Sequence, residues 1–172
     1  SGADRMRMLA SVYRAGSLLP LVGAGMSIPS GYGAWGDFLL SLLQDAPQAV
    51  PVVSALVRDE KFEEAAEYVH DIVGADVFDE EIHNRLGSHR VTAEGPVNLL
   101  PVLFEREILT TNFDYVLTNA YRRAGKPFIH EFCGTALDDA WLKVASEPHC
   151  LLRIHGEADS ANGRILTLSE YS

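Results

Sequence analysis

Short apolar runs that alternate with helical patterns constrain this chain more than any other feature. Such alternation predicts an α/β fold, a Rossmann-like parallel sheet flanked by helices. Pro20 cannot donate to a sheet ladder, so the first strand reduces to Leu21 and Val22. The strand-like runs lie at residues 18–22, 107–111, 126–130, 149–155 and 164–169.

Helical patterns fill the intervals between these runs. Asp4 is placed to cap a first helix that ends near Arg14. A block from about residue 36 to residue 104 is helical throughout and interrupts the alternation, so we expect an inserted helical module within a single domain of residues 4–172. The expected helices cover residues 4–14, 62–73, 77–86, 96–103, 114–123 and 137–145.

Composition excludes several classes of protein. The net charge of −10 provides no basic surface for nucleic acid or anionic lipid. No apolar run approaches the roughly 20 residues needed to cross a bilayer. Cys133 and Cys150 are too few for a disulfide framework and lack the CxxC spacing of a zinc site, so we expect no metal. A reducing cytoplasm is the expected location.

Three polar segments directly follow predicted strands. They are the glycine-rich segment Gly23 to Ser27, the residues Asn112 and Asp114, and His155. Ligands of open parallel sheets bind beyond the carboxyl ends of the strands. The fold would therefore bring these distant segments to one edge of the sheet.

Each segment also has an ordinary structural interpretation. Gly23 and Gly25 allow a close backbone approach to phosphate, but Ile28 stands where a dinucleotide fingerprint has its third glycine, and a plain strand-to-helix turn remains open. Asn112 or Asp114 can simply cap a helix. The remaining histidines have no comparable context, except that His130 also ends a predicted strand; they are His70, His83, His89, His130 and His149.

The ordered set "GAGMS", "TTNFD" and "RIHG" resembles the sirtuin-like superfamily of NAD-binding domains over about residues 18–171. The resemblance implies that the first motif holds the phosphates and ribose of NAD, and that Thr111, Asn112 and Asp114 line the nicotinamide side. It implies that His155 is the catalytic base. The implied phosphate-binding residues are Gly23, Ala24, Gly25, Met26 and Ser27.

Two departures from the deacetylase sirtuins indicate the subfamily. The chain has "SGYGAW" where those enzymes carry Pro-Asp-Phe-Arg, and no cysteine follows Cys150, so their four-cysteine zinc module is missing. The segment with Trp35 is similar to that of sirtuin-like domains in bacterial anti-phage proteins, which hydrolyse NAD on infection. The resemblance thus implies an NAD hydrolase, with a protein deacylase or a non-catalytic NAD or ADP-ribose sensor as alternatives.

The chemistry expected of such a site is cleavage of the nicotinamide–ribose bond through an oxocarbenium-like transition state. Asn112 would orient a ribose hydroxyl or the water, and His155 would accept a proton. Sirtuin-like folds usually continue through further strands, so we expect an N-terminal portion of such a domain, with an unpaired sheet edge and a capacity to form homo-oligomers. A sensor domain or partner subunit is expected elsewhere in the full-length protein.

Overall fold

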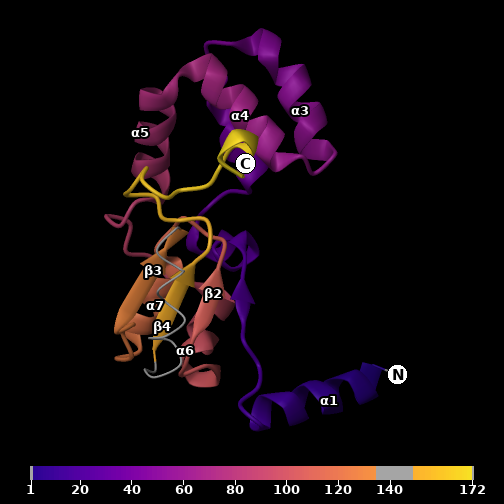
Figure 1. Cartoon of the computed structure of the whole chain (residues 1–172), viewed down its shortest axis with the longest axis vertical. Coiled ribbons are helices and arrows are strands. Elements are labelled where there is room, and N and C mark those ends of the chain that lie inside the picture. The colour runs from indigo at the N-terminus through magenta and orange to yellow at the C-terminus, as the bar shows by residue number, and fades with distance from the viewer. Residues whose placement is uncertain (1, 135–148, 172) are drawn as a thin grey trace.

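The fold is built around a four-stranded parallel sheet in the order β1-β2-β4-β3 (Figure 1). The computed structural model describes residues 2–134 and 149–171. In the register, Val22 pairs with Thr110, and Thr110 pairs with Arg153. The predicted Rossmann-like α/β class is confirmed. The strands are β1 (Leu21–Val22), β2 (Ile108–Thr110), β3 (His130–Cys133) and β4 (Cys150–Arg153).

The shortness of β1 follows from Pro20. Its carbonyl accepts the N–H of Leu109 at 3.0 Å, but the residue has no N–H to return. The strand therefore contains Leu21 and Val22 alone, as predicted. β1 also forms one edge of the sheet, and Leu21 is 63% exposed there.

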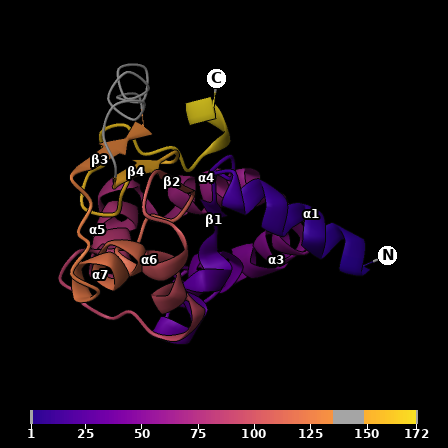
Figure 2. The same cartoon turned by 90° about the horizontal axis from the view of Figure 1, so that it is seen from below.

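One layer of helices packs on a face of this sheet (Figure 2). Tyr121 and Val97 are fully buried against Ile108 and Leu151 of the strands. The sheet and this layer are called the sheet lobe below. The helices of the layer are η4 (Gly95–Leu99), α6 (Leu100–Leu103) and α7 (Val116–Arg123).

Four further helices form a second unit, called the helical lobe, around a core of their own. Leu39, Val53 and Val69 are completely buried in that core. Ala158 and Leu166 also enter it, so the chain returns from the sheet to the helical lobe near its end, as Figure 1 shows. The helices are α2 (Trp35–Ser41), α3 (Val50–Arg58), α4 (Phe62–Val73) and α5 (Ala75–Leu86).

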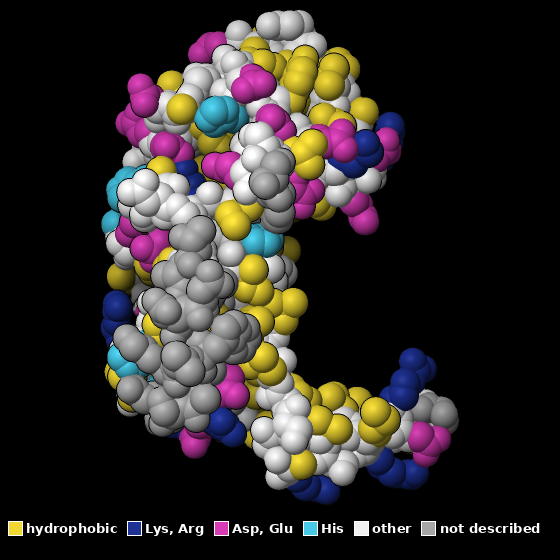
Figure 3. Space-filling view, in the orientation of Figure 1, with side chains coloured by type: hydrophobic (Ala, Val, Ile, Leu, Met, Phe, Trp, Pro, Cys, Tyr) yellow, Lys and Arg dark blue, Asp and Glu magenta, His cyan; other side chains and the backbone are white. Residues whose placement is uncertain are grey.

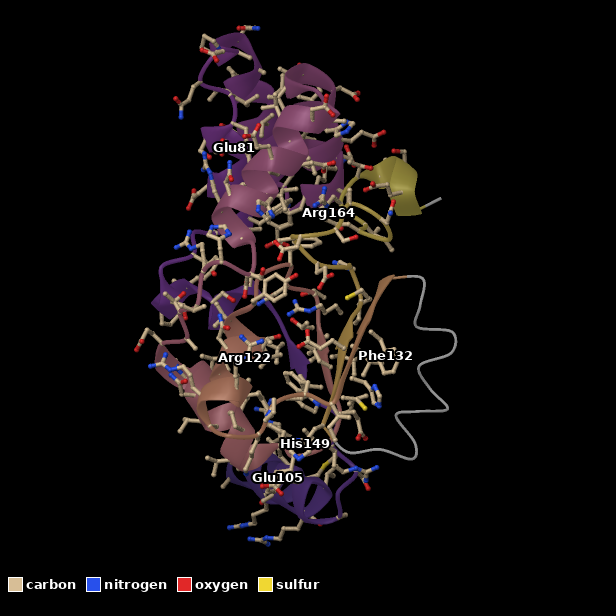
Figure 4. All side chains as sticks on the ribbon, turned by 90° about the vertical axis from the view of Figure 1, so that its left-hand side faces the viewer. Glu81, Glu105, Arg122, Phe132, His149 and Arg164 are labelled. Atoms are coloured by element: carbon tan, nitrogen blue, oxygen red, sulfur yellow. The ribbon has the colours of Figure 1, made fainter. Side chains whose placement is uncertain are left out.

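The predicted strand over residues 164–169 is wrong. This segment is a loop that runs into the 3₁₀ helix η6 (Leu168–Tyr171). The Glu170 carboxylate accepts the N–H groups of Leu166 and Thr167, both at 2.8 Å, so these donors are not available to a sheet ladder. The Arg164 guanidinium reaches Asp79 of α5 and fixes the segment on the helical lobe (Figure 4).

Two other boundaries differ from the prediction. The strand expected to end at His130 begins there, because its register is set by pairing with β4, where His130 lies beside Cys150. His130 therefore lies at the amino end of the sheet, away from the edge where ligands bind. Asp4 lies inside the first turn of α1 (Gly2–Arg14), where it pairs with Arg7 at 3.0 Å, rather than capping the helix. The helix expected over residues 137–145 lies outside the described residues.

Helix α1 projects from the body of the molecule and has no buried residue. Met8 is 70% exposed, and Figure 3 shows hydrophobic side chains along α1 on the side facing the hollow of the molecule. Its contact with the sheet lobe is made by Tyr13, whose hydroxyl donates to the carbonyl of Leu103 at 2.7 Å. Within the described ranges, no helix has both the length and the apolar character that a membrane crossing requires.

Candidate functional site

A cavity of about 710 Å³ lies between the sheet lobe and the helical lobe. The carboxyl ends of β2 and β4 and the glycine-rich segment after β1 form one side of it, and α2, α4 and α5 contribute the other. Gly23 and Met26 are not among its lining residues. The sequence-predicted residues that line it are Ala24, Gly25, Ser27, Thr111, Asn112, Asp114 and His155.

A hydrogen-bonded chain joins two of the sequence-distant motifs. The Asn112 side-chain N–H donates to Ser27 Oγ at 3.0 Å. The Ser27 hydroxyl in turn forms a hydrogen bond with the Asp114 carboxylate. All three side chains are buried. The loop after β1 and the loop after β2 are therefore held together by polar groups at the base of the cavity.

The Asn112 side chain is only half satisfied. Its Oδ1 atom is buried and has no hydrogen-bond partner among the described residues. The backbone N–H of Asn112 donates to Thr110 Oγ1 at 3.1 Å, and the side-chain N–H is held by Ser27, so both the backbone and the side chain of this residue are positioned. An unpaired buried acceptor costs free energy, and a ligand that donates a hydrogen bond would satisfy it.

Asp114 combines a structural role with an unfavourable charge. Its carboxylate accepts the N–H of Val116, the first residue of α7, at 2.9 Å. The N-cap position itself is Tyr115, so the expectation that Asn112 or Asp114 occupies it is wrong, although Asp114 still binds the start of the helix. Burial raises the pKa of Asp114, although hydrogen bonds from Val116 and Ser27 and the charge of Arg153 oppose this shift. Perturbed carboxyl groups in a cleft are typical of functional sites.

Asp114→Asn is expected to raise the melting temperature at pH 7 by a few degrees. The folded-state pKa is raised, so the group's favourable contribution is present at acid pH and is lost as pH rises through that pKa. Asparagine keeps an oxygen for the Val116 N–H and removes the buried charge. Thermal melts between pH 4 and 8 test this. A lower melting temperature at pH 7 would show that the ionic contacts outweigh the cost of burial.

The loop carrying Asn112 and Asp114 is positioned by Arg153, which sequence reasoning did not single out. The Arg153 side chain is completely buried on β4. Its guanidinium donates to the carbonyl of Asp114 at 2.8 Å and to Thr118 Oγ1 at 2.9 Å. Glu131 balances the charge at 3.2 Å. A charged residue within an apolar strand was the available signal, since a buried charge requires partners of this kind.

His155 follows β4 at the rim of the cavity. The N–H of Ile154 donates to the carbonyl of Thr110 at 2.9 Å, which extends the sheet as far as the residue before His155. Gly156 is left-handed, with φ of 84°, and an added Cβ would lie 2.7 Å from Arg164 Cα. The glycine of the "HG" pair is thus required by the close passage of the chain.

The imidazole of His155 is half-buried. Burial lowers its pKa, and the negative charge of Glu63 on α4 partly opposes that shift. The ring is therefore neutral at pH 7 and can accept a proton. Glu63 also lines the cavity, so the helical lobe brings a carboxylate to the side facing the sheet.

Aromatic rings form an apolar wall of the cavity. Trp35 stacks on Phe38 with ring centroids 4.9 Å apart and lies 5.6 Å from Phe113. Phe113 in turn lies 6.4 Å from His155. Trp35 packs against the core of the helical lobe and also lines the cavity, which suits the burial of a planar ring of a ligand.

Comparison with known families agrees with this arrangement. Residues 106–172 match the family model of the SIR2-like domain. The match covers about two fifths of the chain and includes Asn112, Asp114 and His155, whereas the glycine-rich segment lies before it. It supports the sirtuin-like family and a function connected with NAD. No curated protein matches the chain.

The residues present fit the diphosphate of a dinucleotide. In the part of the chain that the structure describes, no group of three or more His, Cys, Asp or Glu side chains is placed to hold a metal. A Cβ added at Gly25 would meet no atom within 4 Å, so this backbone borders open space in the cavity. The N–H groups of Ala24 and Gly25 have no acceptor among the described residues and are available to an anion.

Proposed function

We propose that the chain provides the site of an NAD hydrolase, which cleaves NAD to nicotinamide and ADP-ribose. The observation that carries the proposal is the convergence of the Asn112–Ser27–Asp114 hydrogen-bonded chain and His155 on one cavity. The SIR2-like family match covers Asn112, Asp114 and His155 and supports NAD as the ligand.

In this proposal, each residue has a distinct role. The backbone of Gly25 approaches the phosphates, and Asn112 uses its unpaired Oδ1 to orient a ribose hydroxyl or the attacking water. His155 accepts the proton of that water. The nicotinamide ring carries its positive charge in NAD and leaves as a neutral molecule, so it needs no proton from an acid. The transition state mainly requires orientation and stabilisation of the ribosyl cation, which the attacking water then captures.

We further propose that this reaction acts in bacterial anti-phage defence, in the cytoplasm. The sequence has only two cysteines, too few for a disulfide framework, which suits a reducing compartment. The proposed domain is residues 4–172 with a helical insertion at 36–104. A sensor domain or partner subunit would supply the activating signal.

The direct test is nicotinamide release from NAD by the full-length protein, measured by chromatography. Release of equal amounts of nicotinamide and ADP-ribose supports the hydrolase. Release that occurs only with an acylated peptide would replace it with a deacylase. Tight NAD binding without release, in protein activated by infected-cell extract, would replace it with a sensor.

Gly25→Ala is expected to weaken NAD binding about tenfold or more without destabilising the protein. The added methyl group meets no protein atom but occupies the space where phosphate would approach the backbone. Isothermal titration with NAD and a thermal melt give the two readouts. Gly2→Ala is the matched control, because its added methyl also meets no atom and it lies outside the cavity. Unchanged NAD affinity in Gly25→Ala would place the phosphates elsewhere.

A further inference from the structure

The charges that line the cavity do not balance by themselves. Three carboxylates, Asp37, Glu63 and Asp114, face two cations, Arg85 and Arg90. A dinucleotide would add the negative charges of its diphosphate to this set. In a chain of net charge −10, a bound diphosphate therefore needs a specific positive partner.

Arg85 is already committed to other protein groups. Its Nε atom pairs with Glu81 on the same helix at 2.8 Å. One terminal nitrogen donates to Ser41 Oγ at 2.6 Å. These contacts neutralise the guanidinium and hold it against α2. Arg85 is therefore a structural link inside the helical lobe.

Arg90 has a different environment. Within residues 2–134 and 149–171, no carboxylate lies within the 4.0 Å of an ion pair with its guanidinium. One terminal nitrogen donates to the carbonyl of Arg85 at 3.0 Å, and the remaining N–H groups have no acceptor among the described residues. Arg90 is half-buried and lines the cavity, so it is a cation with unused donors at the binding surface.

The position of Arg90 is fixed before any ligand binds. Its guanidinium carbon lies 4.6 Å from the centroid of the Tyr32 ring, a stacked arrangement that favours a planar cation. Its backbone carbonyl accepts the side-chain N–H of Asn119 at 3.0 Å, which ties this residue to α7. Little conformational entropy remains to be lost when an anion binds.

This stacked pair lies beside the glycine-rich segment. The N–H of Tyr32 donates to the carbonyl of Ser27 at 3.4 Å, so the ring that supports Arg90 belongs to the same loop system as Gly25. Gly25, Ser27, Tyr32 and Arg90 all line the one cavity. An anion between the loop and the guanidinium would contact backbone N–H groups on one side and a fixed cation on the other.

We propose that Arg90 is the anion-binding residue of the cavity and pairs with the diphosphate of a nucleoside diphosphate ligand. The proposal rests on the proposed function for the identity of the natural ligand, NAD, but its chemistry requires only the diphosphate. Arg90 lies outside the three sequence motifs, in the segment that follows α5.

The test compares ADP with adenosine as probes, by isothermal titration. Arg90→Gln is expected to weaken ADP binding about 10–100-fold, the usual effect of losing a charge-assisted hydrogen bond, and to leave adenosine binding unchanged. Arg90→Lys, which keeps the charge but loses the planar stack, should give an intermediate affinity. Arg122→Gln is the control, because it removes the same charge from an exposed position at the end of α7 (Figure 4).

The outcomes separate this proposal from the hydrolase. Equal ADP affinity in wild type and Arg90→Gln would overturn the assignment, as would wild-type protein that binds no ADP. An equal loss in Arg122→Gln would also overturn it, since the effect would then reflect overall charge. If Arg90→Gln weakens ADP binding as expected but the wild-type protein releases no nicotinamide, the role of Arg90 in diphosphate binding is supported and the hydrolase proposal is rejected. Unchanged adenosine binding shows that the variant cavity is intact.

Discussion

Replacing His155 with alanine is expected to lower nicotinamide release from NAD by about 10²–10⁴-fold, the usual contribution of a general base. The imidazole lies at the rim of the cavity and is neutral at pH 7 because burial lowers its pKa. Alanine removes the proton acceptor without adding volume. The fold should be retained, since the chain turn depends on Gly156 rather than on the histidine side chain.

Initial rates of nicotinamide release at saturating NAD measure this effect. His130→Ala is the matched control, because His130 is the first residue of β3 and lies at the amino end of the sheet, away from the cavity. The control should keep wild-type turnover. Full activity in His155→Ala would remove this residue from the mechanism, and equal losses in both variants would indicate a general effect on the fold.

The dependence on pH gives a second readout for the same residue. The rate constant kcat/KM should fall as pH decreases through the folded-state pKa of His155, which lies below 6.5. The same shift affects stability. A lowered histidine pKa gives a contribution that is present above the unfolded pKa of about 6.5 and is lost as pH falls through the folded pKa.

Asn112→Ala is expected to lower turnover by about 10²-fold, comparable to the loss from misplacing a reacting group. Alanine removes both the donor that holds Ser27 and the unpaired Oδ1 that would orient the water or ribose. KM for NAD should rise less than kcat falls, because the diphosphate contacts remain. The folded state should persist, since removing an unpaired buried oxygen relieves a cost.

Steady-state kinetics over a range of NAD concentrations separate kcat from KM. Asn84→Ala is a suitable control, because Asn84 is exposed on α5 and lies outside the cavity. Asn112→Asp tests the geometry further, since it keeps an oxygen but loses the N–H donor to Ser27. Wild-type kcat in Asn112→Ala would show that orientation depends on another group.

Much of the sheet could be predicted from the sequence, because its signals are local. Pro20 limited β1, and the apolar runs before Asn112 and His155 marked β2 and β4. Parallel strands bring their carboxyl ends to one edge, so the approach of Ser27 to Asn112 followed from topology. The strand expected at residues 164–169 failed because Glu170 takes the N–H groups of that segment, a contact that strand propensity does not encode.

The residues contributed by the helical segments could not be predicted in the same way. Helical periodicity shows that one face of α4 is buried, but it does not show that Glu63 at its start faces His155. The role of Arg90 could not be predicted, because the sequence does not show that its guanidinium lies over the ring of Tyr32. The role of Arg153 could not be predicted either, because it depends on its ion pair with Glu131. Glu131 lies on β3, which begins four residues later than the sequence pattern predicted.

The contacts of Arg153 limit which substitutions this part of the sequence can accept during evolution. The guanidinium serves Glu131, Thr118 and the loop carbonyls of residues 112 and 114 at once. Loss of the arginine alone leaves the Glu131 carboxylate without its counter-charge and the loop after β2 without its anchor. A substitution at position 153 therefore needs both a compensating change at position 131 and a new donor for the loop carbonyls, so we expect position 153 to change rarely.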